Sequence, residues 1–133
     1  MQRAGKVLLI DDDRDFKAAV RAVLEGAGYS VVEADCGKHG LRVLVEEAPD
    51  LIVVDIMMAT STDGYGVTQS IKHREEFKEY RRTPVIMVSS IEESPDDLFP
   101  MAEEVDMIRP DIYLTKPLDF PAFLETVRKA LAT

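Results

Sequence analysis

Short runs of apolar residues alternate along the chain with longer stretches in which apolar residues recur every three or four positions. The short runs predict strands that are buried on both faces, and the longer stretches have the period of helices that bury one side. Strands are predicted at Lys6–Ile10, Tyr29–Ala34, Leu51–Val54, Pro84–Val88 and Asp111–Thr115. Helices are predicted around residues 16–24, 41–48, 67–80, 98–108 and 123–131. The chain therefore consists of successive strand–helix units.

Regular alternation of strands and helices favours one parallel sheet with helices on both faces, because crossovers between parallel strands are right-handed and usually helical. The predicted fold class is α/β, a doubly wound five-stranded parallel sheet flanked by helices. A length of 133 residues with 46% hydrophobic content suits a single domain over residues 1–133 with its core in residues 6–131. We expect no effector domain in this chain.

Charge and composition narrow the range of partners and locations. A formal net charge of −9 argues against direct nucleic-acid binding and against binding to anionic membrane surfaces. Cys36 is the single cysteine, which excludes an intramolecular disulfide, and the sequence lacks a signal peptide or an apolar stretch long enough to span a bilayer. The prediction is a cytoplasmic protein whose partners are proteins or small ligands.

Polar residues stand where the predicted strands end. Asp11 and Asp12 follow the first strand, Asp55 ends the third, Ser89 ends the fourth and Lys116 follows the fifth. Ligands of doubly wound folds bind beyond the carboxyl ends of the strands, so we expect these side chains to lie at one edge of the sheet. A carboxylate can attack phosphorus, and an anionic donor then needs a divalent metal and a cation nearby. Mg²⁺ prefers oxygen ligands, which the crowded aspartates supply.

Each of these residues has a simpler explanation when it is taken alone. The aspartates at 11–13 could cap the helix that follows, because aspartate is a preferred N-cap residue, and Asp13 is predicted to have that role. Asp55 could be a turn residue and Lys116 a solvated surface lysine. Their joint placement at the ends of different strands favours the site.

The pieces LLIDDD, LIVVDIMM with DG shortly after, PVIMVSS and YLTKPLD resemble the receiver domain of bacterial two-component response regulators. The resemblance covers about Lys6 to Leu131 and implies a flavodoxin-like, receiver-type fold. It also implies a phosphoacceptor signalling domain that takes a phosphoryl group from a histidine kinase or phosphotransfer protein. Such a domain catalyses only its own phosphorylation and dephosphorylation, and its change of conformation controls a downstream protein partner or effector domain outside this chain.

The resemblance assigns the acceptor and the metal ligands. It implies that Asp55 is the phosphoacceptor. It further implies that Mg²⁺ is held by Asp11, Asp12, Asp55 and the backbone carbonyl of Met57. These assignments place the cofactor between the first and third strands.

The resemblance also assigns the phosphoryl-binding and switch residues. Ser89 and Lys116 are implied to bind the phosphoryl group, and Ser89 and Tyr113 to change position on activation. Output is implied through the fourth helix, fifth strand and fifth helix, a surface that could also form a homodimer. Two segments depart from the family pattern, namely the loop after Asp55 and residues 92–111.

Two other functions remain as alternatives at this point. A small metal-dependent phosphohydrolase could use Asp55 as its nucleophile, but such an enzyme would need a carboxylate two residues later, where Met57 stands. A phosphorylation-independent interaction module could keep the fold without using the site. Loss of an acidic residue or of Lys116 would favour that alternative, and neither is lost.

Overall fold

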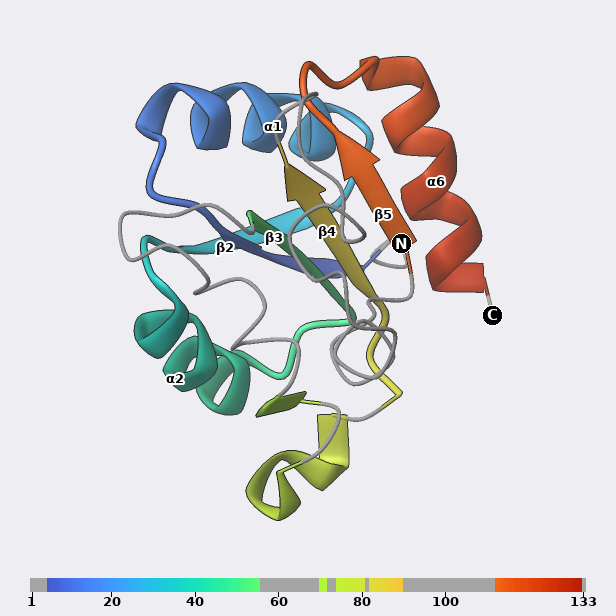
Figure 1. Cartoon of the computed structure of the whole chain (residues 1–133). Coiled ribbons are helices and arrows are strands. Elements are labelled where there is room, and N and C mark those ends of the chain that lie inside the picture. The colour runs from blue at the N-terminus through green and yellow to red at the C-terminus, as the bar shows by residue number, and fades with distance from the viewer. Residues whose placement is uncertain (1–4, 56–69, 72–73, 81, 90–111, 133) are drawn as a thin grey trace, which may run out of the picture.

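The fold is a parallel sheet between two layers of helices (Figure 1). The computed structural model describes residues 5–55, 70–71, 74–80, 82–89 and 112–132, and it describes only the backbone of Ser89, Tyr113 and Thr115. The strands are β1 (Lys6–Ile10), β2 (Ser30–Ala34), β3 (Leu51–Asp55), β4 (Val85–Ser89) and β5 (Ile112–Thr115). Their order in the five-stranded sheet is β2-β1-β3-β4-β5, and each neighbouring pair is parallel. The predicted doubly wound sheet is confirmed.

The described helices agree with the predicted helices in place but differ at some ends. They are α1 (Arg14–Gly26), α2 (Gly37–Glu47), the 3-10 helix η1 (Glu75–Tyr80) and α6 (Phe120–Ala132). The helix predicted around residues 98–108 lies outside the described residues. In the part of the chain that the structure describes, no helix has both the length and the apolar character needed to cross a bilayer.

The prediction of one helix over residues 67–80 was wrong in its last part. Residues 75–80 form a 3-10 helix, and Phe77 has a φ of −113° and a ψ of 18° that interrupt it. The Phe77 side chain is buried in the core, and its N–H donates to the carbonyl of Arg74, three residues back. Packing of this ring fixes a tighter turn in a segment whose other residues are mostly charged and exposed.

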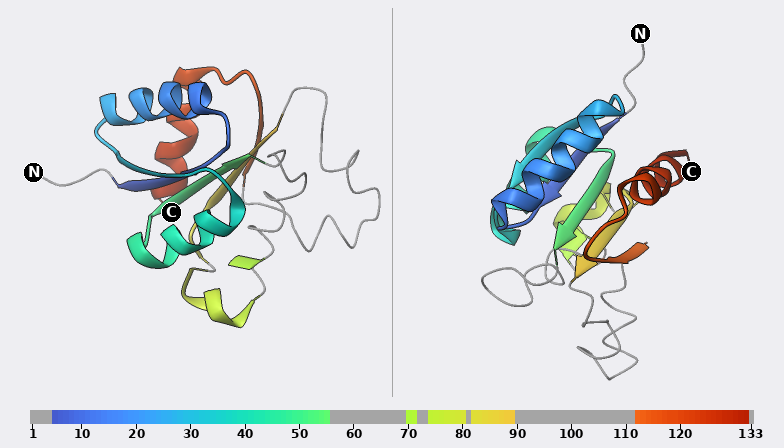
Figure 2. Two further views of the ribbon diagram at one scale, coloured as in Figure 1. Left: turned by 90° about the vertical axis from the view of Figure 1, so that its left-hand side faces the viewer. Right: turned by 90° about the horizontal axis from the view of Figure 1, so that it is seen from above.

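The core lies on both faces of the sheet because side chains of a strand alternate between faces. Val7 and Leu9 of β1 pack with α1 and α6 residues such as Val20 and Phe123, whereas Leu8 and Ile10 face the cluster that contains residues of α2 and η1. Figure 2 shows α1 and α6 on one side of the strands and α2 on the other. Burial on both faces explains why the strands are continuous apolar runs.

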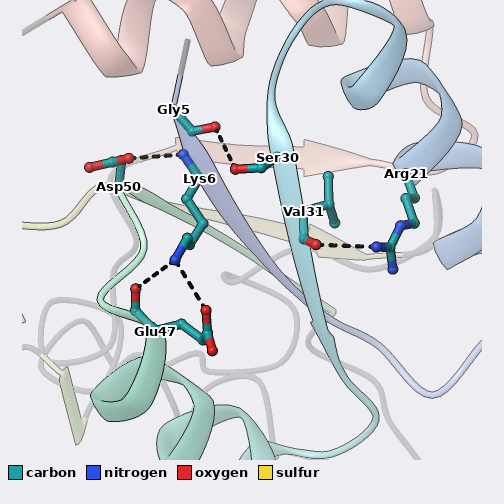
Figure 3. Close-up of polar contacts among 7 residues, drawn as sticks. All are labelled: Gly5, Lys6, Arg21, Ser30, Val31, Glu47 and Asp50. Atoms are coloured by element: carbon teal, nitrogen blue, oxygen red, sulfur yellow. Dashed lines mark hydrogen bonds and ion pairs between the residues drawn. The ribbon is translucent and has the colours of Figure 1, made fainter. Parts of the chain in front are cut away.

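Polar contacts at the amino ends of the strands fix the edge of the sheet opposite the predicted site (Figure 3). The Lys6 N–H donates to Asp50 Oδ2 at 2.8 Å, and Lys6 Nζ donates to the Glu47 carbonyl and Oε1 at 3.2 and 3.1 Å. Glu47 is the last residue of α2, so the lysine satisfies a carbonyl and adds positive charge at that helix end. These contacts hold β1 to α2 and to the start of β3.

Replacing Ala48 by glycine is expected to raise the free energy of unfolding by about 0.5 kcal/mol. Ala48 caps α2 in the left-handed conformation, with φ 47° and ψ 62°. That conformation costs about 1 kcal/mol for a residue with a Cβ, and glycine removes this cost. Glycine also has more conformational freedom in the unfolded chain, which offsets part of the gain in stability. Urea unfolding measures the change.

Ala27→Gly is the matched control, because Ala27 caps α1 with φ −93° and ψ 2°. Here glycine relieves nothing and loses chain entropy, so stability should fall by about 0.5 kcal/mol. The same sign of change in both variants would contradict the explanation from backbone conformation.

Candidate functional site

The site forms where the carboxyl ends of three strands bring aspartates and a lysine together. Asp11 follows β1 and Asp55 ends β3, and these strands are neighbours in which Ile10 pairs with Val54. The carboxylate oxygens that Asp11, Asp12 and Asp55 can offer all lie within 4.8 Å of one another. Asp11 and Asp55 are buried, with 1% and 6% of their surfaces exposed, whereas Asp12 is exposed. The predicted gathering of these side chains is present in the structure.

Lys116, directly after β5, bridges the two buried carboxylates. Its Nζ lies 3.3 Å from Asp11 Oδ2 and 3.4 Å from Asp55 Oδ2, and about a quarter of its side chain is exposed. Nζ also lies 4.1 Å from the centroid of the Phe16 ring in α1. The ring shields one side of the ammonium and attracts it through its π electrons, so it helps to hold the cation between the carboxylates.

The turn between β1 and α1 gives the aspartates their arrangement. The Asp13 N–H donates to Asp11 Oδ1 at 2.8 Å, which orients the Asp11 carboxylate from its own chain. Asp13 is the N-cap of α1, and its Oδ1 accepts the Phe16 N–H at 3.1 Å. The predicted capping role of Asp13 is confirmed, and the cap fixes the position of Phe16 beneath Lys116.

Burial raises the pKa of Asp11 to about 6, because the ionised carboxylate loses hydration in the interior. The Asp13 N–H works in the opposite direction, the charge of Asp55 raises the pKa further, and Lys116 lowers it. The loss of hydration and the charge of Asp55 therefore raise the pKa of Asp11 by more than Lys116 lowers it. The site therefore carries unfavourable negative charge that a bound cation would relieve.

The donor set fits Mg²⁺. Three carboxylates and one ammonium leave two excess negative charges, which a divalent cation neutralises. Ligands on opposite sides of one Mg²⁺ lie about 4.2 Å apart, so oxygens within 4.8 Å of one another need only small adjustments. All the side-chain donors are oxygens, as this cation prefers.

Two predicted site residues are described by their backbone alone, and a third is not described. The backbone of Ser89 ends β4 and pairs with Thr115, and the backbone of Tyr113 pairs with Met87. Both residues therefore belong to strands of the same sheet, but the described part of each is its backbone alone. Met57 lies outside the described residues, as do the segments that depart from the family pattern.

Phe16 is a site residue that the sequence reasoning missed. Its position in the helical pattern of α1 was assigned to packing, and the ring does contact the core cluster as a partly buried residue. Its second contact, with Lys116, joins residues 100 positions apart, so no local pattern indicates it. The one available signal was its place in the first turn after the aspartates.

The comparisons with known proteins agree with this geometry. The sequence profile described as "Response regulator receiver domain" matches residues 7–128. The chain therefore belongs to the receiver-domain family of response regulators, the signalling modules of two-component systems. The resemblance inferred from the sequence is confirmed.

Individual relatives differ in length. The chain is 35% identical over 123 residues to Protein PilG of Pseudomonas aeruginosa, covering 92% of this chain and 84% of that protein. It is 31% identical to the probable transcriptional regulator ycf27 of Guillardia theta, covering 98% of this chain but 46% of that protein. The chain thus spans about half the length of some curated relatives and most of the length of others.

A solved structure gives the same architecture. The chemotaxis response regulator CheY4 of Vibrio cholerae superposes with a TM-score of 0.77 at 26% identity, covering 94% of this chain and 97% of that one. The profile match identifies the family, and the superposition agrees with the fold.

Proposed function

We propose that Asp55 is the residue that accepts the phosphoryl group, with Mg²⁺ as cofactor and a phosphohistidine of a histidine kinase or phosphotransfer protein as donor. One observation carries this proposal: buried Asp55 lies with Asp11 and Asp12 in a cluster of carboxylate oxygens, and Lys116 bridges Asp11 and Asp55. A structural ion pair would need only one carboxylate for Lys116, whereas three carboxylates gather at this site.

The transfer is a displacement at phosphorus. A carboxylate oxygen of Asp55 forms the new O–P bond while the P–N bond to the donor imidazole breaks, and the imidazole nitrogen keeps the electron pair. Lys116 is positioned to follow the negative charge, because its Nζ already contacts Asp55. We assign the hydroxyl of Ser89, which ends β4, as a hydrogen-bond donor to the phosphoryl group.

Asp11 and Asp12 are the proposed side-chain ligands of Mg²⁺, together with Asp55 and the carbonyl of Met57. When bound, the metal supplies positive charge that lets an anionic donor approach the aspartates. Two contacts fix the Asp11 carboxylate for this role. The Asp13 N–H donates to Oδ1, and Lys116 Nζ donates to Oδ2. Self-catalysed phosphorylation of this kind needs no separate enzyme site.

Incubation with acetyl phosphate and Mg²⁺ tests the proposal. Wild type is expected to gain the mass of one phosphoryl group in intact-mass measurements, and Asp55→Asn is expected to gain none. Chelation of the metal should remove at least about 90% of the labelling, because the excess negative charge then opposes the donor.

Asp35→Asn is the control, since Asp35 is an exposed carboxylate outside the cluster. It should be labelled as wild type. Equal labelling of Asp55→Asn, or full labelling without metal, would contradict the assignment. Turnover of a phosphoester in place of stable labelling would support a phosphohydrolase instead.

Phosphorylation is proposed to act through Ser89 and Tyr113. Charge on Asp55 can change the conformation only through contacts that differ between the two states, and the Ser89 hydroxyl and Lys116 would supply those contacts. With Mg²⁺ and beryllofluoride as a phosphoryl mimic, hydrogen exchange over residues 90–113 should change in wild type and much less in Ser89→Ala. The same response in both proteins would exclude a switch through this hydroxyl.

The proposed output is a protein contact through β5, α6 and the predicted fourth helix, with homodimerisation through the same surface as one form. The transcriptional regulators among the relatives extend beyond the region that matches this chain. Absence of direct nucleic-acid binding by this chain, as well as a cytoplasmic location, remain predictions from its charge and composition.

A further inference from the structure

The cation of the acidic cluster, Lys116, has contacts of two kinds. Its Nζ donates to Asp11 Oδ2 at 3.3 Å and to Asp55 Oδ2 at 3.4 Å. It also lies over the ring of Phe16, 4.1 Å from the centroid. An ammonium group has three N–H donors, so the two carboxylates leave one side of it for the ring. The ring therefore belongs to the surroundings that determine where this cation lies.

The two carboxylate contacts of Lys116 are long for ion pairs. Charge-assisted N–H···O hydrogen bonds commonly measure about 2.7–2.9 Å, and Lys6 Nζ lies 3.1 Å from Glu47 Oε1 in the same molecule. The side chain of Lys116 is also 25% exposed, so water competes for its ammonium. Neither carboxylate alone fixes the cation, and the attraction of the ring face adds a third restraint.

The first turn of α1 fixes the ring relative to the aspartates. The Asp13 N–H donates to Asp11 Oδ1 at 2.8 Å, and Asp13 Oδ1 accepts the Phe16 N–H at 3.1 Å. The ring also packs against the core cluster on the side of the sheet that α1 and α6 cover. Lys116 closes this circuit of contacts, because it touches both the ring and Asp11. A shift of the ring would therefore be felt by the cation.

A ring suits this place because phosphorylation changes what Lys116 has to contact. When an Asp55 oxygen bonds to phosphorus, the phosphoryl oxygens become the strongest acceptors nearby, and the ammonium has to shift toward them. Attraction to a ring face extends to about 6 Å from the centroid, so a cation that starts at 4.1 Å can move by about 2 Å and stay within reach. A hydrogen-bonding group in place of the ring would hold the lysine at its starting point.

We propose that Phe16 is a positioning residue for phosphoryl transfer, whose ring holds Lys116 beside Asp55 while the ammonium passes from the carboxylates to the phosphoryl group. This role rests on the proposed function of Asp55. Core packing is the simpler explanation for Phe16, and another apolar side chain of similar volume would meet that need as well. The two explanations differ in one respect, because only positioning depends on the negative potential of the ring face.

Stepwise fluorination of the Phe16 ring tests the proposal on the full chain. Each fluorine withdraws electron density from the ring face and weakens its attraction for a cation, whereas the size of the ring changes little. With acetyl phosphate and Mg²⁺, an Asp55 oxygen bonds to phosphorus and acetate leaves with the electron pair of the broken O–P bond. The rate of this labelling is expected to fall with each added fluorine, by about fivefold in total. Equal rates across the series would overturn the proposal.

Ordinary substitutions separate the ring from its packing. Phe16→Leu keeps an apolar side chain without π electrons, so the rate should fall about fivefold, whereas Phe16→Tyr keeps an aromatic face and should stay within about twofold of wild type. Tyr29→Leu is the matched control and should be labelled as wild type, because Tyr29 packs against the same core cluster beyond the other end of α1. An equal loss of rate in Phe16→Tyr and Phe16→Leu, or in Tyr29→Leu, would assign the effect to packing and reject the proposal.

Nuclear magnetic resonance without metal or phosphoryl donor measures the contact itself. Protons near the face of an aromatic ring resonate upfield, so the ε-methylene signal of Lys116 should lie upfield of the other lysine signals in wild type and return toward them in Phe16→Leu. Lys116→Met identifies this signal by its loss. A Lys116 signal at the ordinary position in wild type would overturn the proposal.

Failure of the positioning role can be told from failure of the proposed function. Labelling of wild type at an equal rate in the Phe16 variants would reject the role of the ring alone. Absence of any label on Asp55 in wild type would reject the proposed function and the positioning role together.

Discussion

Replacing Asp11 by asparagine is expected to stabilise the metal-free protein by about 2 kcal/mol at pH 8. The Asp11 carboxylate is 1% exposed, and burial beside Asp55 raises its pKa to about 6 from the ordinary value of 3.8. Since one pKa unit corresponds to about 1.4 kcal/mol, the ionised carboxylate costs the folded state up to about 3 kcal/mol. Asparagine removes that cost, keeps an oxygen for the Asp13 N–H, and loses the contact with Lys116.

The effect has a defined dependence on pH. A raised pKa means that the folded state binds the Asp11 proton more tightly than the unfolded state does, so wild type loses stability as the pH rises from about 4 to about 6. Below this window the carboxyl is protonated in both states and carries no such cost. The stability gain of Asp11→Asn should therefore be small at pH 4 and fully developed above pH 7. Urea unfolding in a chelator across this range measures it.

Addition of Mg²⁺ should reverse the order of stability. A cation that binds only the folded state adds stability in proportion to the logarithm of its concentration over its dissociation constant. Wild type should gain in millimolar Mg²⁺ and Asp11→Asn should gain little, because a proposed ligand is lost. Asp15→Asn, at an exposed position in the first turn of α1, is the control and should change stability by less than about 0.5 kcal/mol. A destabilised Asp11→Asn without metal would contradict the explanation.

The sheet could be predicted well because its strands are buried on both faces. The run Val7 to Ile10 is apolar without interruption, and all four of its residues have no exposed surface. The start of α2 could not be predicted in the same way. This helix begins at Gly37, and the Sγ of Cys36 accepts the His39 N–H at its cap. Cysteine is not a usual capping residue, so the sequence placed the helix only where Leu41 begins its apolar pattern.

The sequence predicted which residues come together in the candidate site. It did not predict the contacts that hold these side chains in place. Asp11 and Lys116 follow strands and Asp55 ends one, and the carboxyl ends of these strands must share an edge once the sheet is parallel, so the proximity of the three residues follows from topology. The Phe16 ring beside Lys116 depends on the exact path of the first turn of α1. The burial of Lys17 likewise depends on how α1 lies against edge strand β2, and the helical pattern alone would place this lysine in solvent.

Replacing Gly40 by alanine is expected to lower the free energy of unfolding by about 2 kcal/mol, although alanine favours helices. A Cβ on Gly40, the fourth residue of α2, would lie closer than 3.0 Å to both Cδ1 and Cγ1 of Ile10. Ile10 is completely buried in β1, so it has little room to move. Overpacking of this kind costs about 1–3 kcal/mol or more, which exceeds the gain of about 1 kcal/mol from helix propensity.

Gly26→Ala is the matched control, because Gly26 ends α1 and a Cβ there would have no atom within 4 Å. It should stabilise the protein by a few tenths of a kcal/mol. Ile10→Val removes the Cδ1 atom that the new Cβ at position 40 would meet, so the double variant should be more stable than the sum of the two single changes predicts, by about 1 kcal/mol. Additive changes would show that the clash with Ile10 is not the cause.

The Gly40 contact also links the packing of α2 to the acidic cluster. Ile10 immediately precedes Asp11, whose carboxylate must stay near Asp12 and Asp55. Pressure on Ile10 from a new Cβ would shift the end of β1 and with it this carboxylate. Gly40→Ala should therefore lose part of the stabilisation by Mg²⁺ that wild type shows, and the change to valine at position 10 should restore it. A variant that is destabilised but keeps the full response to Mg²⁺ would confine the effect of Gly40 to packing.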